Sequence, residues 1–322
     1  MKKQRFTGPM GQRIKAHLAL RRSLGFLYQT PEYDLDAFDQ HLAIHFPNCK
    51  TITRKMIISY LDSTHHHKPR TRTGHVNILR QFCRYMFQFD ADTYIPEKGL
   101  VGPASVETKS HIFTEEEIIK LIEQTKQLHV KNTLLQYTYA TIIGLLWVTG
   151  MRIGEVVRLK IEDIDTTEGI IFVRETKFFK SRLIPLSVST ANALIAYKQR
   201  RACFGYSDEA STPFFFNNRD KPCITATTPR TIRELMYRAG LKTAQGGTPR
   251  VHDIRHSFAT RWLLDFYQSG KDPTVYLPVL ATYMGHANIA NTQVYLHPSI
   301  ELLSIANQKL HSYLLSFPGE RS

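Results

Sequence analysis

The stretch that decides the fold is residues 251–260, which read VHDIRHSFAT. It follows a turn-forming Gly-Gly-Thr-Pro at residues 246–249, and its apolar positions indicate the start of a helix. His252 and Arg255 are three positions apart, so on a helix they share one face, one turn from each other. A fixed cation beside a proton-transfer group suits an anionic oxygen that is held while protons move. The alternative is an ordinary helix that opens on a polar turn and buries its apolar side.

The composition is that of a folded protein with a polyanionic partner. The chain has 322 residues, of which 42% are hydrophobic and 11% aromatic, enough for two domains with real cores. Its formal net charge is +14. Residues 1–110 contain 17 Lys/Arg against 9 Asp/Glu, and the remainder contains 25 against 19, so both parts are basic. DNA or RNA is favoured over a membrane surface, because no long basic amphipathic segment with an exposed apolar stripe is present.

Three further patterns limit the class of protein. No apolar run approaches the ~18 residues of a membrane span, and no apolar signal core follows the basic start, so we expect a cytoplasmic protein. The histidine run at residues 65–67 has no partner at ligand spacing and is interpreted as a polar loop. Four widely spaced cysteines predict buried free thiols, with no disulfide framework or zinc site: Cys49, Cys83, Cys203 and Cys223.

Residues 1–92 are predicted to form a compact helical domain, because apolar residues recur at spacings of three and four. Its first helix is expected to contain Ile14 and Leu18, to continue through residues 24–27 and to end near Thr30-Pro31. The clearest apolar stripe lies in residues 76–86. Basic side chains precede this helix or face away from its stripe, and we expect them to contact a DNA backbone rather than form only a solvated face: Arg70, Arg72, Arg80 and Arg84.

Residues 93–112, where proline and glycine interrupt the periodicity, are predicted to link this domain to a second one over residues 113–322. The second domain opens on a capping box at Thr114–Glu117. It is predicted to be mainly helical with one small antiparallel sheet. The expected strands are residues 170–173 and 183–186, around a basic loop in which Lys180 and Arg182 are expected to contact DNA. The expected helices are residues 133–148, 188–201, 229–239, 252–268, 273–284 and a segment from 291.

Four residues outside the opening stretch are candidates for chemistry. Arg152 follows a glycine turn at a helix start, with Glu155 placed to brace it; the alternative is a surface ion pair, which stabilises little. Lys177, at the tip of the predicted hairpin, and His286, just after a helix end, are of types that are usually only solvated. Tyr295 is of a type that usually packs, and its phenol is a poor nucleophile until its proton is removed.

Together these residues resemble the signature of the tyrosine recombinase/phage integrase family. That signature is an arginine in T-G-x-R-x-x-E, a hairpin lysine, H-x-x-R, G-H and a tyrosine about nine residues on. It is found here in order as Arg152, Lys177, His252, Arg255, His286 and Tyr295. The resemblance covers residues 113–297 strongly, and residues 10–90 look like the family's core-binding domain. It implies a two-domain architecture of helical core-binding domain and mixed catalytic domain.

The resemblance implies DNA cleavage by Tyr295, with a 3′-phosphotyrosyl intermediate and a free 5′-hydroxyl. Arg152 and Arg255 would clamp the phosphate, so that cations act in place of a metal and no cofactor is needed. His252 would assist proton transfer from the tyrosine, and Lys177 would protonate the leaving oxygen. Glycine commonly flanks the family's lysine, whereas here phenylalanine follows, so Lys180 is an alternative. His286 would add a bond to the phosphate, Glu155 and Asp253 would support the site, and His256 is assigned a structural role.

The leading interpretation is a site-specific recombinase that grips duplex DNA with both domains and assembles as a tetramer on two sites, with a slight preference for a mobile element. The apolar tail after Tyr295 would dock on a neighbouring protomer or pack within its own chain. The alternatives are a type IB topoisomerase-like relaxing enzyme and a DNA-binding accessory protein without catalysis.

Overall fold

The computed structural model describes residues 5–26, 28–102, 110–128, 134–174, 181–217, 220–269 and 271–285. The chain divides into two compact units, residues 1–108 (unit 1) and residues 109–322 (unit 2). Within the described ranges, no helix is both long enough and apolar enough to cross a membrane.

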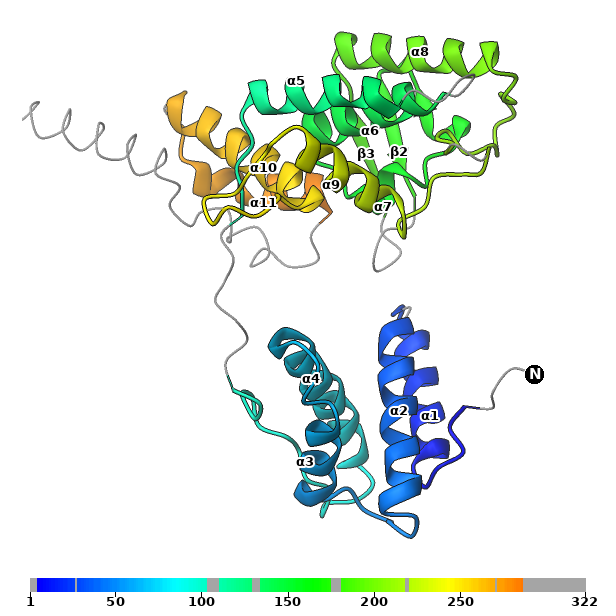
Figure 1. Cartoon of the computed structure of the whole chain (residues 1–322), viewed down its shortest axis with the longest axis vertical. Coiled ribbons are helices and arrows are strands. Elements are labelled where there is room, and N and C mark those ends of the chain that lie inside the picture. Colours follow the sequence, from blue (N-terminus) through cyan, green and yellow to red (C-terminus); the bar gives the residue numbers. More distant parts are fainter. Residues whose placement is uncertain are drawn as a thin grey trace, which may run out of the picture. The chain divides into compact units, whose positions relative to one another are not determined.

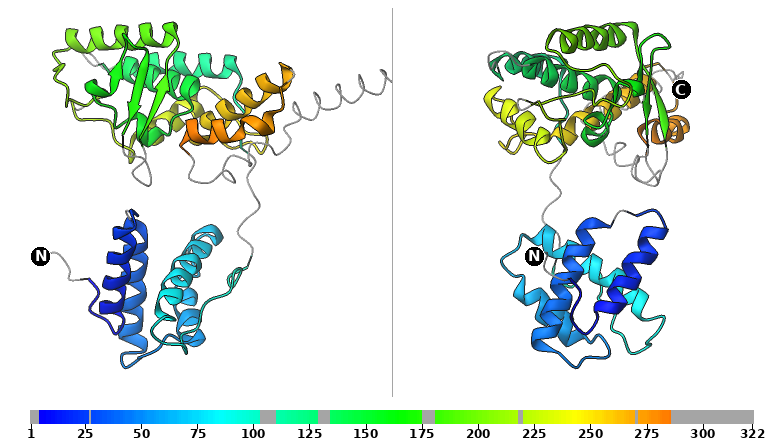
Figure 2. Two further views of the ribbon diagram at one scale, coloured as in Figure 1. Left: turned by 180° about the vertical axis from the view of Figure 1, so that it is seen from behind. Right: turned by 90° about the vertical axis from the view of Figure 1, so that its right-hand side faces the viewer.

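The described part of unit 1 is a bundle of four helices (Figure 1). They are α1 (Gly11–Ser23), α2 (Gln29–His45), α3 (Arg54–Ser63) and α4 (Pro69–Met86). Each packs on at least two of the others, as two further views show (Figure 2). The apolar stripe predicted in residues 76–86 faces the centre of this bundle, because its members are all buried: Val76, Leu79, Phe82, Cys83 and Met86.

The prediction for the first helix was wrong at its end. Helix α1 stops at Ser23, and Gly25 after it has a φ of 86°, a left-handed conformation that breaks the helix. Leu24 is 59% exposed and does not continue the buried face. Pro31 lies instead in the first turn of α2, where a missing N–H costs no hydrogen bond.

Residues 93–102, the first ten of the predicted linker, are attached to unit 1. The backbone N–H of Tyr94 donates to the carbonyl oxygen of Ile52 at 2.8 Å, and the Arg80 guanidinium donates to the carbonyl oxygen of Pro96. Leu100 packs against the same core. Apolar residues among the prolines and glycines therefore attach residues 93–102, which lie in the predicted linker, to the bundle.

Unit 2 is mainly helical in its described residues. Its helices are α5 (Glu115–Gln124), the 3-10 turn η1 (Thr125–Leu128), α6 (Leu135–Thr149), α7 (Ile153–Val156), the 3-10 turn η2 (Ile161–Asp163), α8 (Val188–Cys203), α9 (Thr228–Arg238), α10 (Val251–Gln268) and α11 (Pro273–Met284). Helix α6 runs through the interior and packs against α5, α8 and α10 (Figures 1 and 2). Because it is covered on several sides, it is apolar almost all round.

The sheet of unit 2 is antiparallel and has the strand order β1-β2-β3. Its strands are β1 (Ile164–Asp165), β2 (Ile170–Val173) and β3 (Arg182–Pro185). The predicted hairpin is confirmed, with β3 one residue earlier than expected; Val173 pairs with Arg182 at the end that leads into residues 175–180. The two-residue β1 was not predicted, because it is too short for an alternating pattern.

The capping box at the start of α5 is confirmed. Thr114 Oγ1 accepts from the backbone N–H of Glu117, and Glu117 Oε2 accepts from the backbone N–H of Thr114 at 3.1 Å. The preceding Phe113 is buried, and its N–H donates to Ser257 Oγ on α10 at 2.8 Å. The start of unit 2 is thereby anchored to the helix that carries the stretch at 251–260.

All four cysteines are free thiols. Cys83 and Cys223 are buried as predicted, and Cys49 is half-buried. The prediction of burial was wrong for Cys203, which is exposed in the last turn of α8. Among the residues that the structure describes, no cluster of histidine, cysteine and carboxylate side chains could hold a metal ion, and His65–His67 lie in a turn between α3 and α4.

Candidate catalytic site

The site begins at the turn that ends α6. Gly150 follows the helix with a φ of 60°, a conformation that favours glycine. A Cβ atom at this position would lie 2.3 Å from Cδ1 of Phe258 on α10. The missing side chain therefore lets the turn press against α10, and it brings the Gly150 carbonyl oxygen to Arg255.

Arg152 occupies the residue before α7, as the predicted helix start requires. Its backbone N–H donates to Glu155 Oε2 at 2.9 Å, and its Nη1 donates to Glu155 Oε1 at 2.9 Å. The Arg152 side chain is 34% exposed, whereas that of Glu155 is only 3% exposed. The pair is therefore no ordinary surface ion pair: a buried carboxylate holds an arginine whose guanidinium still reaches solvent.

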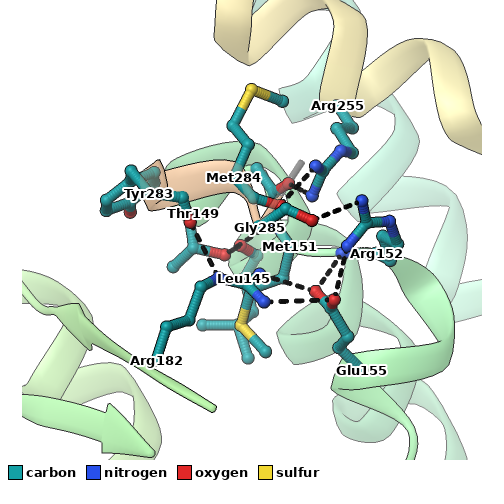
Figure 3. Close-up of polar contacts among 11 residues, drawn as sticks. Leu145, Thr149, Met151, Arg152, Glu155, Arg182, Arg255, Tyr283, Met284 and Gly285 are labelled. Atoms are coloured by element: carbon teal, nitrogen blue, oxygen red, sulfur yellow. Dashed lines mark hydrogen bonds and ion pairs between the residues drawn. The ribbon is translucent and has the colours of Figure 1, made fainter. Parts of the chain in front are cut away.

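Arg152 and Arg255 converge on one turn after α11 (Figure 3). Arg255 Nη1 donates to the Gly150 carbonyl oxygen at 2.7 Å, and its Nη2 donates to that of Met284 at 2.6 Å. Arg152 Nη2 donates to the carbonyl oxygen of Gly285 at 3.0 Å. Two arginines from distant parts of the sequence thus fix adjacent peptide groups immediately before residue 286.

A third arginine completes this cluster. Arg182, the first residue of β3, donates from Nε to the Tyr283 carbonyl oxygen at 2.7 Å. Its Nη2 and Nη1 donate to Glu155 Oε2 at 2.7 Å and Oε1 at 3.2 Å. The side chain is 10% exposed. The sequence assigned Arg182 to DNA contact because it ends a basic loop, but its guanidinium lies inside the site. No local pattern in the sequence indicates that position.

The electrostatics of the cluster favour a bound anion. Arg152 and Arg182 share the single Glu155 carboxylate, and the Arg255 guanidinium binds the same turn, so positive charges outnumber negative ones among these four side chains. Burial alone would raise the pKa of Glu155, but the hydrogen bonds and charge of Arg182, with those of Arg152, outweigh it and lower that pKa to about 2. The carboxylate is therefore ionised throughout the physiological range.

His252 lies on α10, one turn before Arg255, and is exposed. Neighbouring protein atoms displace part of its hydration, and this effect together with the Arg255 charge lowers its pKa below the usual range. The His256 ring lies edge-to-face at 4.9 Å from that of His252. Burial lowers the pKa of His256 to about 4, with a further contribution from His252. Both rings are neutral near pH 7, so His252 is able to accept a proton.

Asp253 serves the start of α10. It is 1% exposed and accepts from the backbone N–H of Arg250 at 2.8 Å and from Arg250 Nη2 at 2.7 Å. These bonds cap the helix and fix the first turn, which carries His252 and Arg255. The support that the sequence assigned to Asp253 thus passes through the backbone.

Four residues of the predicted set lie outside the described residues: Lys177, Lys180, His286 and Tyr295. The predicted DNA contacts of unit 1 fall into two groups. Arg70 and Arg84 are exposed. Arg72 and Arg80 are half-buried and donate to backbone carbonyl oxygens, those of Leu61 at 3.4 Å and of Pro96.

Comparison with known proteins gives a consistent result. Residues 111–301 match the model of the phage integrase family. The chain is 32% identical over 303 residues to the protein named "Putative integrase/recombinase y4rB" of Sinorhizobium fredii, which covers 93% of this chain and 96% of that protein. It is 30% identical over 220 residues to the tyrosine recombinase XerA of Pyrococcus furiosus, 68% of either chain.

Solved structures share the fold. The Tn1549 transposon integrase has a TM-score of 0.67 at 17% identity, over 93% of this chain and 98% of that one. The XerH site-specific recombinase has a TM-score of 0.62 at 21% identity, over 86% of this chain and 78% of that one. With a family match over more than half of its length and relatives of 30% identity or more, this chain belongs to the phage integrase family and is a tyrosine-type site-specific recombinase.

Proposed function

We propose that this protein cleaves and rejoins duplex DNA through a 3′-phosphotyrosyl intermediate, and that the cluster around residues 284–285 holds the scissile phosphate. The observation that carries the proposal is the convergence of Arg152 and Arg255 on adjacent carbonyl oxygens, with His252 one turn away on α10. Guanidinium groups are planar forks that match phosphate oxygens, and two fixed forks at one turn provide a preorganised anion site.

Each residue of the site has a role in this scheme. Tyr295 Oη attacks the phosphorus atom, so a P–O bond to tyrosine forms as the bond to the 5′-oxygen breaks. The tyrosine proton passes by way of His252, whose neutral ring is able to accept it. Lys177, or Lys180 in its place, gives a proton to the leaving 5′-oxygen. Attack by a second 5′-hydroxyl reverses these steps and conserves the energy of the ester, so no nucleotide is consumed.

Arg152 and Arg255 stabilise the charge that develops on the non-bridging oxygens in the transition state, and His286 adds a further hydrogen bond. Cations held by the fold take the part that a metal ion has in other phosphoryl-transfer sites. Removing a single preorganised donor of this kind typically costs about 10²–10³ in rate.

Unit 1 would serve as the core-binding domain, with the exposed Arg70 and Arg84 on the DNA backbone, and four protomers would assemble on two sites. The net charge of +14 supports a DNA partner, and the Tn1549 integrase and XerH structures both contain DNA. We further propose a mobile-element role, which the similarity to the Sinorhizobium protein named as an integrase/recombinase supports.

The experiment uses a duplex with a nick near the cleavage position, built on the sequence that the protein selects from randomised DNA. Wild-type protein is expected to form a covalent adduct. The short strand between the cleavage position and the nick diffuses away with its 5′-hydroxyl, so religation is blocked. Tyr295→Phe is expected to form none while binding the same DNA. An adduct with Tyr295→Phe would contradict the assignment of the nucleophile.

Two alternative functions are distinguished by plasmid assays and by adduct formation. A topoisomerase-like enzyme relaxes supercoils on plasmids without exchanging two sites, whereas a recombinase exchanges them. An accessory protein without catalysis binds the selected DNA and forms no adduct. Arg152, His252 and Arg255 are all present with the geometry described above, which favours a catalytic chain.

A further inference from the structure

We propose that Arg182 is a positioning residue for DNA cleavage: by occupying Glu155, it keeps the Arg152 guanidinium available to the scissile phosphate. The inference rests on the proposed function, in which Arg152 contacts that phosphate. Arg182 itself touches no reacting atom in this scheme.

The position of Arg182 is the first ground for this proposal. It connects three elements, since it extends from β3 to Glu155 on α7 and to the Tyr283 carbonyl oxygen near the end of α11. With 10% of its side chain exposed, it is poorly placed for a direct contact with a DNA backbone. Its guanidinium is instead paired with the Glu155 carboxylate, whose side chain is 3% exposed.

The carboxylate of Glu155 is shared unequally between two arginines. Arg182 places its two terminal nitrogens on the two oxygens, at 2.7 and 3.2 Å. Arg152 makes one side-chain bond to Oε1 at 2.9 Å, and its other terminal nitrogen goes to the Gly285 carbonyl oxygen at 3.0 Å. Arg182 therefore forms a bidentate pair with Glu155, whereas the Arg152 side chain donates only one hydrogen bond to it.

A guanidinium beside a lone buried carboxylate prefers the two-pronged arrangement, because two parallel charged hydrogen bonds form at once. In a dry setting that pairing is stronger still. Without Arg182, Glu155 Oε2 would keep only its bond from the Arg152 backbone N–H, and the Arg152 fork would turn so that it binds this oxygen as well as Oε1. Arg152 would then release the Gly285 carbonyl oxygen, and its charge would be neutralised by Glu155 and no longer offered to a phosphate.

Arg182 also fixes the turn that Arg152 and Arg255 bind. Its Nε holds the Tyr283 carbonyl oxygen, and a Cβ atom on Gly285 would lie 2.8 Å from Arg182 Nη1. The turn at 283–285 thus packs directly on this guanidinium. Loss of Arg182 is expected to loosen this turn as well as to redirect the Arg152 guanidinium.

The test compares four variants of the full chain: Arg182→Ala, Arg182→Lys, the double variant Arg182→Ala/Glu155→Gln, and Arg238→Ala. The last is a matched control, since Arg238 forms an exposed pair with Glu234 on α9 in the same unit. Two quantities are measured. One is the rate of covalent adduct formation on the nicked duplex of the selected sequence. The other is the slope of log binding constant against log salt on a duplex of unrelated sequence.

Arg182→Ala is expected to slow adduct formation about 100-fold, since misplacement of a catalytic group by about 1 Å costs this much. Its salt slope should weaken by up to about 0.9, because Arg152 is withdrawn from phosphate, and the double variant should recover the wild-type slope. Arg238→Ala should keep the wild-type adduct rate. Arg182→Lys should be intermediate, because an ammonium keeps the charge but cannot span both oxygens and the carbonyl. The double variant should recover about tenfold over Arg182→Ala, because a neutral amide does not capture Arg152.

Four results would overturn the proposal. Arg182→Ala that forms the adduct within about twofold of the wild-type rate shows that Arg182 is not needed for positioning. A salt slope that stays weaker by about 0.9 in the double variant shows that Arg182 contacts phosphate directly. A double variant no faster than Arg182→Ala refutes the capture of Arg152 by Glu155. If Arg182→Ala does not fold, the double variant is compared with Arg182→Lys instead. A double variant slower than Arg182→Lys then also refutes this capture. A wild-type chain that forms no adduct refutes the proposed function itself, and the positioning proposal with it.

Discussion

Arg152 Nη2 lies 3.0 Å from the carbonyl oxygen of Gly285, so a residue at the start of α7 is joined directly to the residue after α11. Gly285 has a φ of 66°, a left-handed conformation that is typical of the residue after a helix end. The bond couples the arginine fork to the backbone before His286.

Gly285→Ala is expected to destabilise the protein more than Gly240→Ala does. Both glycines have left-handed backbones, with φ of 66° and 69°, so both substitutions cost about 1–2 kcal/mol of backbone strain. Only at 285 does the added Cβ meet neighbours, Arg182 Nη1 at 2.8 Å and Arg152 Nη1 at 3.5 Å, whereas Gly240 has open space. Urea unfolding measures the difference, and adduct formation should fall for Gly285→Ala alone. Equal effects of the two substitutions would show that the turn is not tightly packed.

His252→Gln is expected to slow adduct formation by about 10²–10⁴-fold while leaving DNA affinity nearly unchanged, because a positioned proton acceptor contributes about this much. The pKa of His252 is lowered, so in the wild type the rate should fall with acidification at a pH below the usual histidine range. His256→Gln, which alters the next ring at 4.9 Å, is the control and should change the rate little. A larger loss for His256→Gln would reassign the proton transfer.

Glu155 is expected to make the protein acid-sensitive. Its pKa is lowered from 4.5 to about 2 on folding, so the unfolded chain binds the proton more readily. The stabilisation is complete above about pH 4.5 and is lost as the pH falls towards 2. Its size is up to about 3 kcal/mol.

Unfolding in urea at pH 7 and pH 3 measures this term. Glu155→Gln should flatten the pH dependence between those values, and it should also destabilise at pH 7, because Arg152 and Arg182 lose their shared carboxylate. Glu234→Gln, which alters an exposed pair, is the control. An unchanged acid transition in Glu155→Gln would show that other carboxylates dominate it.

Arg84 and Arg80 are expected to behave differently although both lie on α4. Arg84 is exposed, so Arg84→Ala should weaken the salt slope of DNA binding by about 0.9 with little effect on stability. Arg80 holds the Pro96 carbonyl oxygen, so Arg80→Ala should destabilise unit 1 by about 1–3 kcal/mol and leave the slope unchanged. Salt titrations and urea unfolding separate the two effects. The opposite pattern would mean that Arg80, and not Arg84, reaches DNA.

Local sequence was sufficient to predict an element where the apolar periodicity and the capping or helix-breaking residues indicated the same bounds. Helix α11 was predicted at residues 273–284 and has these bounds, and the capping box of α5 lies at Thr114 as expected. Prediction was wrong for the end of α1, where the apolar residues among 24–27 extend the pattern but Gly25 breaks the helix. Apolar identity alone does not distinguish a helix that continues from a loop that leans on the core.

The sequence by itself determined the family, the two-unit organisation that we expected, and the local settings of Arg152 and Arg255, each at a helix start. Such features depend on spacing within a few residues. Only the tertiary structure decided that both arginines bind the turn at 284–285, and that Arg182 shares Glu155 with Arg152. These contacts join residues that are 27 to 133 positions apart. They follow from how α7, β3, α10 and α11 pack, and no short-range pattern encodes that packing.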